Sequence, residues 1–232
     1  SSIHREGQAA KAVVEKSRRQ LANALNSNPE EIIFTSSGSE SNNMVLKGVL
    51  NPGDHFITSS YEHPAILKVL PFLESKNIST TIVNPDKNGL IHPSDIEENI
   101  NANTRLISIM WVNNELGTIN PISEIGSIAR NRNILFHSDA VQALGKIYIN
   151  VDETPVDFLS MSAHKLYGPK GIGALYKRRG SKLEPLIHGG GQESNLRAST
   201  ENIGGIAGFG MAAELSTSKL KENTDHILCL ES

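Results

Sequence analysis

Lys165 is the side chain in this sequence with the clearest chemical potential. It follows the apolar run 158–161 and lies in the segment 160–171, which is rich in Ser, His, Gly and Pro. Most lysines are solvated surface charges, but an amine directly after a buried strand can act as a nucleophile and form a Schiff base. Lys170 is the nearest competitor, although its Gly-Pro-Lys-Gly setting is typical of a turn. Lys165 is therefore the best Schiff-base candidate in the chain.

Asp139 provides a carboxylate at the end of another apolar run. It follows residues 136–138, where a carboxylate usually caps a helix but can also hold a protonated ring nitrogen, which requires a fixed anion. Gln142 comes three residues later, and helical spacing would put it on the same face. Asn114 follows the most apolar run, 106–112, in an Asn-Asn pair that suits a turn and also supplies an amide donor.

Residues 34–40 combine a strand end, a turn of small residues that includes Gly38 and Ser39, and a helix start. Free backbone N–H groups at such a start bind phosphate well. Taken alone, a helix cap formed by serine is the better explanation. No lysine follows the glycine, so the segment is not the P-loop of a nucleotide hydrolase, and a phosphate outside a nucleotide stays open.

His63 and Thr200 are weaker candidates. His63 follows the predicted strand 55–58, where an aromatic ring could lie above a flat cofactor, although lone histidines are more often structural. Thr200 follows the three glycines 189–191 and precedes a predicted helix. It would either cap that helix or donate to a phosphate.

These candidates follow predicted strands, and strands alternate with helices along the chain. The predicted strands are 31–35, 55–58, 80–83, 106–112, 134–136, 158–161 and 172–176, the last near the sheet edge. The predicted helices are 6–26, 40–50, a segment after His63-Pro64, 93–101, 121–132 and 201–222. This alternation predicts an α/β fold whose mostly parallel sheet has helices on both faces. In such sheets ligands bind at the carboxyl ends of strands, which is where the candidates lie.

Composition narrows the class of protein. The 22 Lys and Arg residues against 25 Asp and Glu residues give a net charge of −3, which argues against a nucleic-acid binder. The single cysteine, Cys229, excludes an internal disulfide framework and a multi-cysteine metal site. No run approaches the roughly 20 apolar residues of a membrane helix. We therefore expect a cytoplasmic enzyme or binding domain, without a metal site.

The order of these signals resembles that in fold type I pyridoxal phosphate enzymes of the class V aminotransferase group. More closely, the chain is similar to cysteine desulfurases of the NifS/IscS-like group. The matching stretches are residues 1–7, 34–43, 62–63, 112–117, 139–142, 162–173, 188–193 and 197–202. The blocks around Lys165 and Gly190 are highly specific together, and the resemblance covers essentially the whole chain.

The resemblance implies a role for each candidate residue. Lys165 would hold pyridoxal phosphate as a Schiff base and later move protons, and Asp139 would pair with the ring nitrogen. His63 would stack on the ring and help with acid–base steps, so Lys165 and His63 would be the catalytic residues. Asn114 and Gln142 would bind near the ring hydroxyl. The phosphate ligands would be Gly38, Ser39, Ser162 and His164, with Thr200 reaching the phosphate of the other subunit in a homodimer.

The implied reaction takes sulfur from L-cysteine, releases L-alanine and leaves a persulfide for a sulfur-acceptor protein, such as an iron–sulfur scaffold. Two departures look tolerable: Ser37 stands where the family usually has Gly, and Ala198-Ser199 stands where it more often has Ser-Gly. The resemblance also places the nucleophilic cysteine, and an arginine for the substrate carboxylate, beyond residue 232.

Residues 1–232 are thus expected to form an incomplete pyridoxal phosphate-binding large domain without the C-terminal small domain. Cys229 does not match the family's cysteine motif and is predicted to face the core. We expect this chain alone to bind the cofactor weakly or not at all and to have little desulfurase activity.

Three other functions remain open. The runner-up is another class V enzyme, such as a cysteine or selenocysteine lyase. A non-catalytic remnant or partner-binding scaffold is a second, and Lys165, Asp139, His63 and Gln142 together argue against it. A plain α/β nucleotide-binding domain is a distant third, because residues 35–39 are not a dinucleotide fingerprint.

Overall fold

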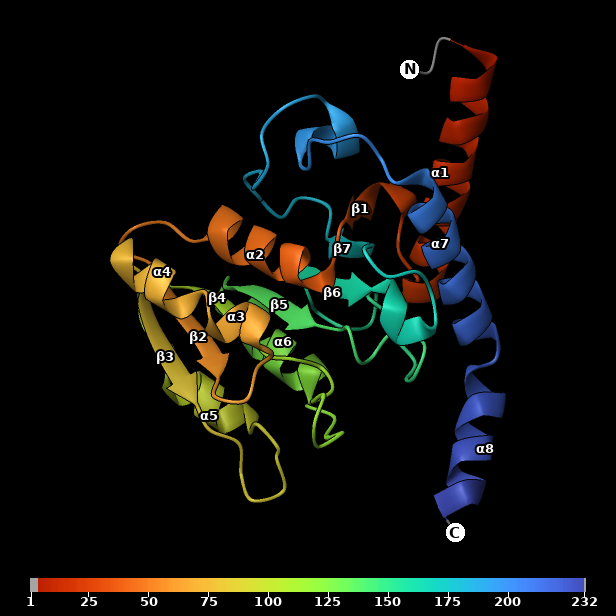
Figure 1. The fold of residues 1–232 in the computed structure, drawn as a ribbon. Coiled ribbons are helices and arrows are strands. Elements are labelled where there is room, and N and C mark those ends of the chain that lie inside the picture. The colour runs from red at the N-terminus through yellow and green to blue at the C-terminus, as the bar shows by residue number, and fades with distance from the viewer. Residues whose placement is uncertain (1–3, 232) are drawn as a thin grey trace.

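The computed structural model describes residues 4–231 and contains a seven-stranded sheet in the order β1-β7-β6-β5-β4-β2-β3 (Figure 1). The strands are β1 Ile32–Thr35, β2 His55–Ser59, β3 Ser79–Val83, β4 Thr104–Ser108, β5 Leu135–Asp139, β6 Phe158–Ser162 and β7 Gly173–Lys177. Five strands that are neighbours in the sheet, β3, β2, β4, β5 and β6, pair in parallel, whereas β7 runs antiparallel to both β6 and β1. The predicted α/β class with a mostly parallel sheet is confirmed.

The helices cover both faces of this sheet (Figure 1). They are α1 Arg5–Leu25, α2 Gly38–Val49, α3 Pro64–Leu67, α4 Leu70–Ser75, α5 Pro93–Glu98, α6 Ile122–Asn131, α7 Ile203–Ser218 and α8 Leu220–Glu231. Helices α2, α3 and α4 bury their apolar side chains in one core cluster, and α1, α6 and α7 bury theirs in another.

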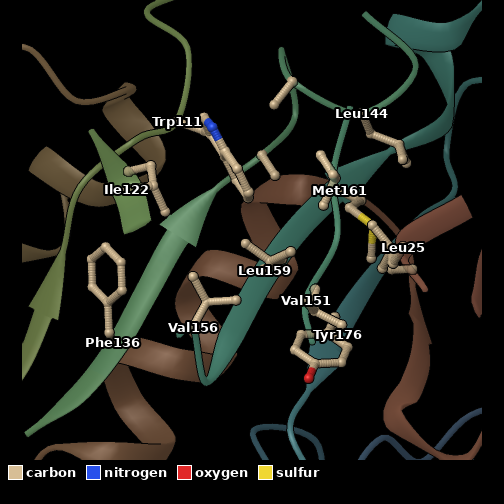
Figure 2. Close-up of a cluster of buried hydrophobic side chains, with 14 of the residues drawn as sticks. Leu25, Trp111, Ile122, Phe136, Leu144, Val151, Val156, Leu159, Met161 and Tyr176 are labelled. Atoms are coloured by element: carbon tan, nitrogen blue, oxygen red, sulfur yellow. The ribbon is translucent and has the colours of Figure 1, made fainter. Parts of the chain in front are cut away.

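Alternation along the strands divides the core into these two clusters. Phe158 packs toward α2, while its neighbour Leu159 packs in the cluster of α1, α6 and α7. Phe56 and Ile57 on β2 divide in the same way, as a strand with both faces buried requires. Figure 2 shows part of the second cluster, and burying each such side chain contributes roughly 1.5–3 kcal/mol.

Three local predictions were wrong. The predicted strand 106–112 ends at Ser108, after which the backbone leaves the sheet. Gln142 lies in a turn and not on a helix. The predicted helix 201–222 is two helices, α7 and α8, divided at Lys219.

Helix α8 extends away from the sheet, and residues 221–230 are exposed along its whole length (Figure 1). Cys229 is therefore exposed, so the prediction that it faces the core was wrong. Within residues 4–231, no helix is long and apolar enough to cross a membrane, and no cluster of His, Cys, Asp or Glu could hold a metal ion.

Candidate functional site

A cavity of about 290 Å³ opens where the chain leaves β2, β4, β5 and β6 and where α2 begins. This volume is close to the lower end of the roughly 300–1,000 Å³ typical of small-molecule sites. Nine predicted site residues line the cavity: Gly38, Ser39, His63, Asn114, Asp139, Gln142, Ser162, His164 and Lys165. Segments separated by more than a hundred residues therefore meet at one place, as the strand order requires.

Asp139 is the buried anion of this cavity. Its Oδ2 accepts a 2.7 Å hydrogen bond from Asn42 Nδ2, and its Oδ1 accepts one of 3.0 Å from the backbone N–H of Val141. Burial raises the pKa of Asp139, and these two hydrogen bonds oppose that rise. Both oxygens act only as acceptors of these hydrogen bonds, which suits a carboxylate and offsets part of the cost of burying it.

The first turn of α2 provides the backbone donors. Ser37 is the N-cap, and its hydroxyl accepts from the Glu40 N–H at 3.1 Å. A Cβ at Gly38 would come within 2.7 Å of Val141 Cγ2, so the glycine allows the helix start to approach the turn after β5. The helix N-terminus, with Gly38 and Ser39 in its first turn, attracts an anion.

Lys165 lies in the short 3₁₀ helix Ala163–Leu166, directly after β6. It is exposed to the cavity, and its charge joins burial in lowering the pKa of Lys146. Lys146 Nζ donates to Gln142 Oε1, so the amide nitrogen of Gln142 stays available as a donor. Lys165 in the cavity wall and Lys146 beside Gln142 thus place two amines near the cavity.

His63 and His164 contribute two aromatic rings. His63 is the N-cap of α3, and its Nδ1 accepts from the Ala65 N–H at 3.1 Å, so the neutral ring carries its proton on Nε2. His164 Nδ1 lies 2.9 Å from Ser162 Oγ. Burial, together with the charges of Lys165 and Lys170, lowers the pKa of His164.

Asn114 and Thr200 lie less centrally. Asn114 lines the cavity on the exposed turn after β4, and its amide donates to Glu115 Oε1 at 2.8 Å. Thr200 does not reach this cavity within the chain, because it lines a separate one of about 200 Å³ near β1 and Arg197.

Two partly buried ion pairs hold the loop that carries Thr200. Arg197 donates to both oxygens of Glu40, in the first turn of α2, at 2.7 and 3.2 Å. Arg18 on α1 forms a two-point pair with Glu193 at 2.8 and 2.7 Å, and Glu193 also accepts from the Phe34 N–H at 2.7 Å. The loop is thus tied to α1, β1 and the helix start that lines the cavity.

Sequence reasoning missed several residues at this site. Asn42 and Met110 line the cavity, while Glu40 and the buried Glu62 support it from outside. Glu62 stands next to His63 in the chain, which was a usable signal. Asn42 had none, because its partner Asp139 is 97 residues away.

Comparison with known proteins bears on this geometry. Residues 1–228 match the family model described as aminotransferase class-V. The chain is 48% identical to a cysteine desulfurase IscS of Dictyoglomus turgidum over 231 residues, which are 98% of this chain and 59% of that protein.

Two solved structures are also similar. A NifS-like protein is 39% identical with a TM-score of 0.96, covering 99% of this chain and 65% of that one. A structure described as SspA in complex with cysteine is 47% identical with a TM-score of 0.89, covering 92% of this chain and 63% of that one. The chain thus spans less than two thirds of the length of each of these relatives.

Proposed function

The chain belongs to the class V aminotransferase family, and from this premise we propose that it carries the pyridoxal phosphate site of a cysteine desulfurase. The cysteine desulfurases that it resembles depend on pyridoxal phosphate. The observation that carries the proposal is the meeting of Lys165, Asp139 and the start of α2 in one cavity. A primary amine, a buried carboxylate and a helix N-terminus match the aldehyde, the ring nitrogen and the phosphate of that cofactor.

The surroundings of Asp139 support this fit. A buried carboxylate with two hydrogen-bond donors and no ion pair among the described residues is well placed to hold a positive group that compensates its charge. A protonated ring nitrogen would supply it. When bound, pyridoxal phosphate supplies an electron sink for bonds to the α-carbon of an amino acid.

The other residues are proposed to orient and to move protons. Lys165 holds the cofactor through Nζ and carries a proton to and from the substrate. His63 covers the ring and offers its Nε2 proton. Gln142 and Asn114 donate near the ring hydroxyl. The phosphate is held by Gly38, Ser39, Ser162 and His164, the last two already hydrogen-bonded to each other.

We propose L-cysteine as the substrate and L-alanine as the product. A thiolate of the complete protein attacks the substrate sulfur and forms an S–S bond with it. The Cβ–S bond of the substrate breaks, and the β-carbon takes up a proton to become the methyl group of alanine. Sulfur then remains on the protein as a persulfide for an acceptor protein, such as an iron–sulfur scaffold. The relative whose structure is described as a complex with cysteine supports the choice of substrate.

The assembly is part of the same proposal. Residues 1–232 would form the cofactor-binding domain, and Thr200 would serve the phosphate site of a second copy in a homodimer. The separate cavity that Thr200 lines supports this assignment, because Thr200 does not reach its own chain's cofactor cavity. A cytoplasmic location is proposed because thiol and persulfide chemistry is favoured in a reducing compartment.

The test uses the protein expressed from its complete reading frame. Incubation with L-cysteine and pyridoxal phosphate should yield equal amounts of alanine and transferable sulfur, and Lys165→Ala should abolish both. Lys170→Ala is the matched control and should keep activity. Alanine from selenocysteine but not from cysteine would indicate a selenocysteine lyase, and pyruvate in place of alanine would indicate a cysteine lyase.

A further inference from the structure

Glu62 is a buried carboxyl group that the proposed mechanism does not use. It is 4% exposed and precedes His63 in the turn between β2 and α3. Its Oε1 accepts hydrogen bonds from Ser59 Oγ at 2.6 Å and from the Met110 N–H at 2.9 Å. Its Oε2 is buried and has no hydrogen-bond partner among the described residues.

These two hydrogen bonds join separate parts of the cavity wall. Ser59 is the last residue of β2, and Met110, which lines the cavity, follows β4. Glu62 therefore fixes the turn that carries His63 against the segment after β4. Asn113 reinforces the same junction, because its amide donates to the Tyr61 carbonyl at 3.2 Å.

The surroundings of Glu62 favour its neutral form. Two titratable groups interact electrostatically with Glu62. The charge of Asp139, at the end of β5, raises the pKa of Glu62, and the charge of Glu62 raises the pKa of the adjacent Tyr61. Asp139 has a donor on each oxygen, whereas Glu62 has a bare oxygen, so Asp139 is the better place for a single negative charge. Burial raises the pKa of Glu62 to about 8.

We propose that Glu62 is a positioning residue that, as a neutral acid, holds the turn carrying His63 in place at the wall of the cavity that Asp139 also lines. This inference rests on the proposed function, because it assigns Glu62 to the placement of the ring that covers the cofactor. A neutral Glu62 also avoids a second negative charge acting on Asp139.

The test compares Glu62→Gln and Glu62→Leu in the protein expressed from its complete reading frame, with the exposed Glu74→Leu as control. Glutamine keeps the oxygen that accepts the two hydrogen bonds and replaces the hydroxyl of the neutral acid with an amide NH₂ group. Leucine removes that oxygen and leaves the Ser59 hydroxyl and the Met110 N–H without an acceptor. At pH 7 the pyridoxal phosphate dissociation constant, read from visible absorbance, should stay within about twofold for Gln and rise about tenfold or more for Leu.

A His63→Ala background separates positioning from general damage. If Glu62 acts through His63, Glu62→Leu should weaken binding much less in that background than in the wild type. Three results would overturn the inference. Glu62→Leu could weaken pyridoxal phosphate binding equally in both backgrounds, it could leave binding unchanged, or Glu62→Gln could weaken binding as much as Glu62→Leu does.

A second readout needs no cofactor and still applies if Glu62→Leu does not fold. Because burial raises the pKa of Glu62 to about 8, its neutral form should contribute stability that is lost as the pH rises from about 5 to 8. The free energy of unfolding of the wild type relative to that of Glu62→Gln should therefore decline as the pH rises over this range. If the pH profiles of the wild type and Glu62→Gln run parallel over this range, Glu62 is not a neutral acid and the inference is overturned. A wild type without any lysine-dependent absorbance band would instead overturn the proposed function, whatever the stability profiles show.

Discussion

Asn42 Nδ2 lies 2.7 Å from Asp139 Oδ2, so the helix whose first turn faces the cavity also orients the buried carboxylate. Asn42 is 1% exposed and stands one turn beyond Gly38 and Ser39 on α2. One rigid helix therefore sets the position of both the proposed phosphate cradle and the ring-nitrogen partner.

Asn42→Leu should weaken pyridoxal phosphate binding by about tenfold or more, because a hydrogen bond to a charged group is worth roughly 1.5–3 kcal/mol. Loss of the donor should also raise the pKa of Asp139 further. Titration of the visible absorbance against cofactor concentration measures the affinity. Asn99→Leu, on the exposed end of α5, is the control, and an effect of equal size there would contradict the assignment.

The pair between Arg197 and Glu40 should matter for anion binding. Burial alone would raise the pKa of Glu40, but hydrogen bonds from Arg197 and Ser36 hold it below its usual value. Arg197→Ala should leave an uncompensated carboxylate in the first turn of α2, which repels a phosphate. We expect pyridoxal phosphate binding to weaken about tenfold or more and Glu40→Gln to restore part of it. A double variant no better than Arg197→Ala would contradict this.

The pair between Arg18 and Glu193 should stabilise the fold. The Arg18 and Glu193 side chains are only 11% and 3% exposed, so removing one leaves a buried charge. Arg18→Ala should lower the free energy of unfolding by about 3–5 kcal/mol. The adjacent Arg19 is exposed, and Arg19→Ala should change the free energy of unfolding by less than about 0.5 kcal/mol. Denaturant unfolding measures both, and similar losses would contradict the pairing.

Much of the fold could be predicted from the sequence, because strands buried on both faces form short apolar runs between helices. Runs such as 158–161 and 134–136 correspond to β6 and β5. The direction of β7 could not be predicted: it is antiparallel to both neighbours, and an apolar run carries no signal of orientation. The end of β4 was misplaced because residues 109–111 remain buried after leaving the sheet.

The site was predictable where residues follow strands, as Lys165 and Asp139 do. Asn42 and the partners of Arg197 were not, because their roles depend on contacts between segments far apart in the chain. The wrong prediction for Cys229 has a similar cause. Its half-apolar helix suggested burial, but α8 lies away from the sheet and presents residues 221–230 to solvent.

His137 should make the protein sensitive to acid. It is fully buried between Ser108 and Ser160, and burial lowers its pKa to about 3. Because the pKa of His137 is lower in the folded state than in the unfolded state, its neutral form contributes fully to the free energy of unfolding above about pH 6.5. This contribution is lost as the pH falls toward 3. The free energy of unfolding should fall by at most about 1.4 kcal/mol per pH unit there.

Denaturant unfolding from pH 7 to 4 checks this expectation. His137→Asn should flatten the acid decline, whatever its effect on stability at pH 7. The exposed His226→Asn on α8 should leave the slope unchanged. A wild-type slope that persists in His137→Asn would assign the acid sensitivity to other groups.

The central claim is that Lys165 binds pyridoxal phosphate in the cavity beside Asp139 and the start of α2. The most direct test is the visible absorbance spectrum of the protein, expressed from its complete reading frame, after addition of pyridoxal phosphate. We predict a protein-bound absorbance band that Lys165→Ala lacks and Lys170→Ala keeps. A band of equal strength in Lys165→Ala, or none in the folded wild type, would contradict the claim.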